Sequence, residues 1–285
     1  MYSVVSILLG IISTVFTGSC LAYYCDSFME QRKWFGKYGK YLPIIAFVVI
    51  DYTLDHCFPS SYETKETLGK LALLSAAVFL LGKLFYHAKT QMAAFLTITF
   101  MAIRDLSSFI GMMVVVCGGK LFDLWVLLLQ KEYISVGTTE QLIDVTASIL
   151  QTLMVACYMV LLYKSLKAVL KYYKDKEYPV QRQELLFLLT PGCVGFLLCV
   201  MLRTILLTME NGVPQDLYGK YPILMLVIPA ILILSLLSIV YSVKLFQDMI
   251  MLNREKSDKL ILEKQIKNMQ EHMTEMEHIY SGVRS

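Results

Sequence analysis

The feature that most limits what this chain can fold into is the recurrence of apolar runs long enough to cross a lipid bilayer. A helix needs about 20 apolar residues to span a hydrocarbon core roughly 30 Å thick. Composition agrees, since 56% of the 285 residues are hydrophobic and 17% are charged. We therefore expect an all-α, multi-pass protein of the cell membrane, a bundle of about seven transmembrane helices in contact with the lipid bilayer. The predicted spans are residues 1–25, Tyr41–Phe58, Leu68–Tyr86, Met92–Cys117, Gln141–Tyr163, Glu184–Thr208 and Tyr221–Phe246.

The connection between the fourth and fifth spans, from Gly118 to Glu140, is the part of the fold that is hardest to predict. Its apolar centre, Leu121–Leu129, has nine residues, which is too few to cross the bilayer. We expect an interfacial or re-entrant helix there. If this stretch were a span, every later segment would change sides.

Basic residues orient the predicted spans, because cytoplasmic loops carry an excess of Lys and Arg. With the N-terminus outside, the inner connections hold eleven basic residues and the outer ones five. We therefore expect the N-terminus outside, a sensor domain over residues 1–247 and a cytoplasmic signalling and dimerisation helix over residues 248–285. The net charge of +3 is too small to indicate a nucleic-acid partner.

The last segment carries a heptad pattern, with apolar residues spaced alternately four and three apart. Such a seam along one face of a helix needs a partner helix, so we expect a coiled-coil homodimer. Extending the register backward reaches Lys259 and Glu255, so pairing should begin near Leu260. The chain stops while this helix is still running, and we expect a further domain beyond Ser285. The predicted seam consists of Leu262, Ile266, Met269, Met273, Met276, Tyr280 and Val283.

Five charged residues lie deep in the predicted spans, where an unpaired charge costs several kcal/mol. Asp51 and Asp55 are four residues apart and share one helical face. We expect that face to lie against Arg104 or Arg203 and to form a polar cluster in the outer half of the bundle. Two interpretations remain open: a functional one, as a ligand pocket or a switchable ion pair, and a structural one, as a static polar link between helices. The candidate residues are Asp51, Asp55, Arg104, Asp105 and Arg203.

The first span carries a stripe of small residues. Gly10, Thr14 and Gly18 recur every four residues and therefore share one face. A stripe of this kind permits the close approach of a second helix.

Signatures of catalysis and metal binding are absent from the sequence. It contains no HExxH, GxSxG, GxxxxGK[ST] or GxGxxG motif. The seven cysteines form no CxxC pair, and we interpret them as small apolar residues in the spans. His272 and His278 lie off the seam and are interpreted as solvated positions. We predict no catalytic residue, no metal site and no cofactor in this chain.

Two stretches resemble the membrane sensor region of GHKL-type histidine kinases, the group that includes AgrC-like peptide quorum-sensing receptors. They are the sixth-span stretch QELLFLLTPGCVGFLLCVMLR, with Glu184, Pro191 and Arg203, and the C-terminal stretch NMQEHMTEMEHIYSGVRS. The resemblance implies a receptor for an extracellular small ligand or peptide in a two-component system. It also implies that the phosphoacceptor box, ATP, Mg²⁺ and the response regulator belong to a kinase core downstream of Ser285.

Two alternatives come from other classes of protein. In a small transporter or exporter subunit, the C-terminal helix would recruit a partner, and Asp51, Asp55 and Arg104 would form a substrate or proton path. Against this, no internal repeat is visible. A membrane-embedded enzyme has only the acidic pair in its favour.

Overall fold

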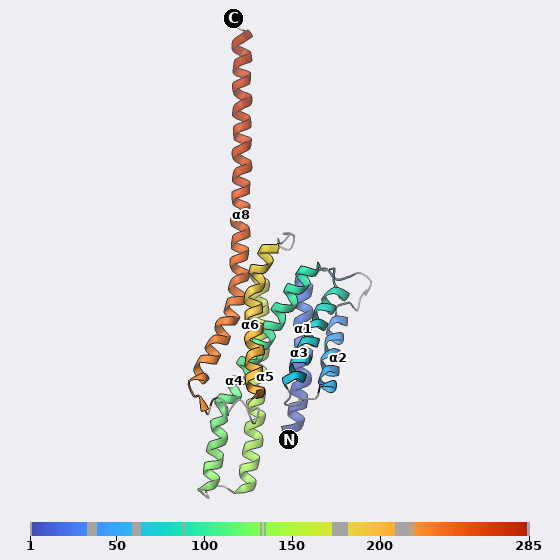
Figure 1. Cartoon of the computed structure of the whole chain (residues 1–285), viewed down its shortest axis with the longest axis vertical. Coiled ribbons are helices and arrows are strands. Elements are labelled where there is room, and N and C mark those ends of the chain that lie inside the picture. Colours follow the sequence, from blue (N-terminus) through green and yellow to red (C-terminus); the bar gives the residue numbers. More distant parts are fainter. Residues whose placement is uncertain are drawn as a thin grey trace.

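The computed structural model is an all-helical bundle from which one helix projects (Figure 1). It describes residues 2–32, 39–58, 64–87, 89–131, 133, 135–172, 182–208, 218 and 220–283. Within these residues the only extended pairing is an isolated bridge between Gln31 and Tyr86. The helices are α1 (Tyr2–Phe28), α2 (Leu42–Cys57), α3 (Thr64–Phe85), α4 (Thr90–Gln130), α5 (Val136–Tyr172), α6 (Arg182–Thr208) and α8 (Leu224–Val283).

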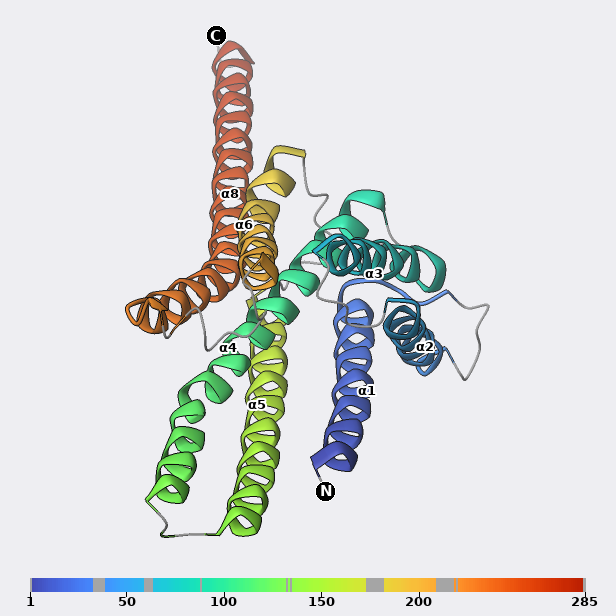
Figure 2. The same cartoon turned by 60° about the horizontal axis from the view of Figure 1, so that its bottom comes forward.

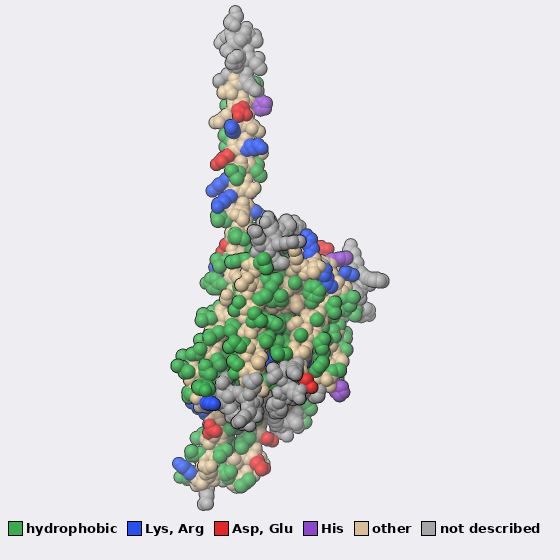
Figure 3. Space-filling view, viewed as in Figure 1, with side chains coloured by type: hydrophobic (Ala, Val, Ile, Leu, Met, Phe, Trp, Pro, Cys, Tyr) green, Lys and Arg blue, Asp and Glu red, His purple; other side chains and the backbone are tan. Residues whose placement is uncertain are grey.

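The described helices confirm a membrane protein. Six of them are long and apolar enough to cross a bilayer. The remaining one, α2, has 16 residues and a length of about 24 Å. It runs beside α1 and α3 (Figure 1), so the chain changes direction at each of its ends. Large apolar side chains cover the outside of the bundle (Figure 3), as a lipid-facing surface requires.

Helix α4 is the centre of the bundle, because it packs against α3, α5, α6 and α8. The first half of α4 forms a dense core in which Phe100, Ile103 and Leu106 are fully buried. Aromatic rings continue this core toward α1: the Tyr24 ring centroid lies 5.1 Å from that of Phe28 and 6.4 Å from that of Phe100. The end of the bundle where α1 ends and α4 begins is therefore filled by side chains.

The expectation of a separate interfacial or re-entrant helix over Gly118–Glu140 is wrong. Helix α4 continues without a break to Gln130, and α5 begins at Val136, so the two form one long hairpin (Figure 2). The glycines do not end the helix because they are packing positions. The Cα of Gly111 faces the Met154 carbonyl, and that of Gly118 faces the Leu150 side chain, which brings α4 close to α5. Leu121–Leu129 is thus not an additional span but the last part of α4.

The small-residue stripe of α1 is confirmed in part. A Cβ atom at Gly18 would lie 3.1 Å from the Phe47 ring of α2, and Thr14 also faces α2. A Cβ atom at Gly10 would meet no atom within 4 Å. The close approach of α2 to this stripe is therefore confined to Thr14 and Gly18.

Helix α8 belongs to the bundle over its first half only. Leu232, Ile239 and Phe246 are buried, and burial ends at Ile250. From Met251 to Thr274 every residue is exposed, and the helix extends away from the bundle (Figure 1). Seam residues Leu262, Ile266, Met269 and Met273 are among these exposed residues, and Met276 is exposed as well. The side chains of Tyr280 and Val283 lie outside the described part.

Candidate functional site

A cavity of about 460 Å³, with six charged side chains in its wall, lies in the bundle and is lined by six helices. Its volume is in the range of small-molecule sites. All five charged residues singled out from the sequence line this cavity. Its lining consists of Ser13, Thr14 and Thr17 from α1; Phe47, Asp51 and Asp55 from α2; Lys70 and Leu74 from α3; Arg104, Asp105, Ser108 and Met112 from α4; Met154, Val155 and Tyr158 from α5; and Arg203 from α6.

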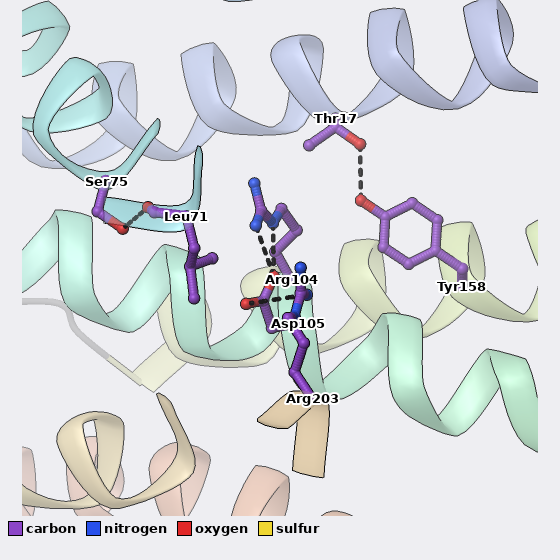
Figure 4. Close-up of polar contacts among 7 residues, drawn as sticks. All are labelled: Thr17, Leu71, Ser75, Arg104, Asp105, Tyr158 and Arg203. Atoms are coloured by element: carbon purple, nitrogen blue, oxygen red, sulfur yellow. Dashed lines mark hydrogen bonds and ion pairs between the residues drawn. The ribbon is translucent and has the colours of Figure 1, made fainter. Parts of the chain in front are cut away.

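Asp105 is the most deeply buried charge, with 2% of its side chain exposed. Its Oδ1 accepts hydrogen bonds from Arg104 Nη2 at 2.6 Å and from Arg104 Nε at 2.8 Å. Its Oδ2 accepts no hydrogen bond from the described residues, and Arg203 Nη2 lies 3.8 Å away. Figure 4 shows the carboxylate between the two guanidinium groups. One anion thus holds two cations, one closely and one loosely.

Arg203 is the less constrained of the two arginines. Its side chain is 29% exposed, and its guanidinium carbon lies 5.8 Å from the centroid of the Phe109 ring, a cation–π contact. It donates no hydrogen bond to any described residue. A guanidinium group has five N–H donors, and none of those of Arg203 is used by a described residue.

The other three charges lie on α2 and α3, toward the exposed end of the cavity. Lys70 forms an ion pair with Asp55, and these side chains are 31% and 55% exposed. Asp51 accepts a hydrogen bond of 3.3 Å from Thr14. The cavity therefore becomes more buried from Asp55 toward Asp105.

Hydroxyl groups complete the wall formed by α1 and α5. The oxygen atoms of Thr17 and Tyr158 are 2.7 Å apart, and Thr17 also donates to the Ser13 carbonyl at 2.7 Å. Tyr158 must therefore donate to Thr17, whose own proton is used by Ser13. This hydrogen bond joins α1 to α5 at the side of the cavity (Figure 4).

The predicted cluster forms, because Asp51 and Asp55 line the same cavity as Arg104 and Arg203, but its ion pairs are different ones. Asp51 and Asp55 were expected against Arg104 or Arg203, but the described ion pairs of those arginines are with Asp105. Asp105 can serve both because it follows Arg104 on α4 and points toward α6. Lys70, Thr17 and Tyr158 were missed as site residues. The one available signal was that Lys70 lies inside an apolar run, two residues after its predicted start.

A second cavity of about 320 Å³ lies beside the first. The two share Ser108, Met112 and Arg203 as lining residues. The wall of the second cavity is otherwise mainly apolar, with Phe109, Leu206 and Leu207. Arg203 thus stands between a charged compartment and an apolar one.

The part of the chain that the structure describes contains no group of three His, Cys, Asp or Glu side chains arranged to hold a metal ion. No protein-family model, curated protein or solved structure matches the chain.

Proposed function

We propose that this chain is the transmembrane receptor part of a sensor histidine kinase. A ligand from the extracellular side binds in the charged cavity, and the bundle passes the signal to a cytoplasmic coiled coil formed by two copies of α8. The kinase core, with its ATP, Mg²⁺ and response regulator, is the output that the sequence resemblance implies.

The observation that carries this proposal is the continuity of α8. A single helix of 60 residues packs in the bundle with its first half and is exposed with its second. Because a helix transmits rotation and translation along its axis, movement in the bundle reaches the exposed seam directly. An apolar seam that stays exposed in one copy gains stability by pairing with a second copy.

Helix α6 connects the cavity to α8. Arg203 of α6 lines the cavity, and Gly195 of the same helix packs between α4 and α8. A Cβ atom at Gly195 would lie 3.0 Å from Leu106 Cδ1 and 3.0 Å from Ser235 Oγ. A displacement of α6 by a ligand at Arg203 would therefore press on α8 rather than be absorbed by a gap.

The signal consists of a change in the populations of two packing states. A ligand shifts that equilibrium only by its difference in affinity for the two states. The methionines of the seam suit such a switch, because Met packs adaptably and tolerates two registers better than a β-branched residue.

The test is an insertion series in α8. Residues 1–285 are fused to a histidine-kinase core, and one, two, three or seven residues are inserted after Leu252. Kinase output is expected to follow helical phase, with a period of about 3.5 residues, so the seven-residue insertion serves as the in-phase control. Output that is the same for all four insertions would overturn the proposal.

A transporter is the second candidate, because charged groups inside the bundle are also typical of substrate paths. The filled core around Phe100 and Tyr24 favours a receptor, since these buried rings are not among the described residues that line the cavity. Substrate flux in proteoliposomes holding residues 1–285 alone would favour the transporter.

A further inference from the structure

The distribution of charge in the cavity identifies the chemistry of its ligand. We infer that the cavity binds a small zwitterion, such as a free apolar peptide, with its carboxylate on Arg104 and Arg203 and its ammonium group on Asp51. This inference rests on the proposed function, because it takes the cavity as the receptor site.

The buried end of the cavity has a surplus of positive charge. Arg104 and Arg203 share one carboxylate, that of Asp105, which leaves a formal charge of +1. Hydrogen-bond donors are also in surplus, because the described contacts use two N–H groups of Arg104 and none of Arg203. Two guanidinium groups with free donors suit one carboxylate, which they can bind by short, charge-assisted hydrogen bonds.

The outer end has the opposite balance. Asp51, Asp55 and Lys70 together carry a formal charge of −1, and Lys70 is paired with Asp55. Asp51 is left with one weak hydrogen bond from Thr14 and is half-buried. An ammonium group at Asp51 would compensate this charge. The whole cavity, with three cations and three anions, is neutral and therefore favours a ligand without net charge.

The second cavity accounts for the apolar part of the ligand. It adjoins Arg203 and offers Phe109, Leu206 and Leu207. A carboxylate held by Arg203 places the neighbouring side chain of the ligand at this apolar wall. A fatty acid from the bilayer also has a carboxylate next to an apolar chain, but it has no ammonium group.

The experiment measures binding to purified residues 1–285 in lipid nanodiscs by equilibrium dialysis. The probes are an equimolar library of apolar tripeptides in free, N-acetylated and C-amidated form, and octanoate. Free peptides are expected to bind at least about tenfold more tightly than either blocked form, the ratio for one charge-assisted hydrogen bond. Equal retention of the three peptide forms, or retention of none of them, would overturn the inference. The comparison uses the unaltered chain, so it does not depend on whether a variant folds.

Variants then assign the two ends. In Arg203→Gln, the affinity for the free peptides is expected to fall to the affinity for the C-amidated peptides. In Asp51→Asn, the affinity for the free peptides is expected to fall to the affinity for the N-acetylated peptides. Asp51→Asn should leave binding of the acetylated form unchanged, and Lys120→Gln, outside the cavity, is the control for charge. Octanoate that binds as well as the free peptides, with no effect of Asp51→Asn, would identify a lipid acid and overturn the zwitterion. Dialysis measures binding alone and the insertion series measures coupling alone, so either proposal can fail without the other.

Discussion

At the scale of single residues, the adjacent Arg104 and Asp105 form the buried ion pair at the centre of the charged cluster. Neighbours on a helix point in directions about 100° apart, so they seldom pair with each other across a bundle. Here both side chains turn into the same cavity, and Arg203 approaches Asp105 from α6. The carboxylate therefore stabilises two positive charges that the apolar core would otherwise disfavour.

Removing this carboxylate should destabilise the protein strongly. Asp105→Asn leaves two arginines next to a neutral amide, and breaking a buried ion pair costs about 3–5 kcal/mol. The measurement is the free energy of unfolding of the purified protein in a detergent titration. The control is Asp55→Asn, which breaks the more exposed pair with Lys70 and should cost about 0–1 kcal/mol. Equal losses in the two variants would contradict a central role for Asp105.

At the scale of helices, the contact of α6 with α4 and α8 depends on the lack of a side chain at Gly195. Gly195→Ala adds a methyl group where Leu106 and Ser235 already lie at 3.0 Å. We expect α6 to be pushed outward, with a loss of about 1–3 kcal/mol from overpacking. The free energy of unfolding is compared with that of Gly10→Ala.

Gly10 is the matched control because a methyl group there meets open space. Gly10→Ala should be neutral or stabilise α1 by about 0.5–1 kcal/mol, the usual preference for Ala in a helix. In the kinase fusion, Gly195→Ala should also change basal output, whereas Gly10→Ala should not. Unchanged stability and output in Gly195→Ala would remove α6 as the connection to α8.

The long hairpin of α4 and α5 is also stabilised at this scale, by contacts near its turn. Ser135 precedes α5, and its hydroxyl accepts a hydrogen bond of 3.3 Å from the Thr138 backbone N–H, which caps the helix. Trp125 of α4 donates to Thr146 of α5 at 3.1 Å. The contact of Trp125 with Thr146 holds the hairpin together beyond the glycines, and it joins residues that sequence patterns do not connect.

At the scale of the whole molecule, the proposed orientation rests on the unequal distribution of basic residues and on the two ends of the bundle. The N-terminus and the projecting end of α8 lie at opposite ends (Figure 1). The turn between α4 and α5 lies at the same end as the N-terminus (Figure 2). From the excess of Lys and Arg in the other connections, we propose that the N-terminal end lies outside and the exposed half of α8 in the cytoplasm.

Labelling of introduced cysteines tests this orientation. Gly137 begins α5 in open space, and Lys264 lies on the exposed half of α8. Gly137→Cys is expected to react with a membrane-impermeant maleimide in intact cells, and Lys264→Cys only after permeabilisation. The parent chain measures the background from its native cysteines. The reverse pattern would invert the proposed topology and exclude a cytoplasmic coiled coil.

The sequence by itself determined the helical membrane class, the approximate positions of the described helices and the exposed seam of α8 from Leu262 to Met276. These follow from local constraints, because backbone groups in lipid must pair within a helix and a heptad places its apolar residues on one face. It also identified the five charges that meet in the cavity, since their cost in lipid requires partners.

Only the tertiary structure decided which charges pair, that Lys70, Thr17 and Tyr158 join them, and that α4 runs through Gly118. These outcomes depend on how each helix is rotated about its axis and on contacts such as Thr17 with Tyr158, which lie 141 residues apart in the chain. Periodicity along one segment contains no information about that rotation relative to its neighbours. The charges were therefore predictable as a group, whereas their geometry was not.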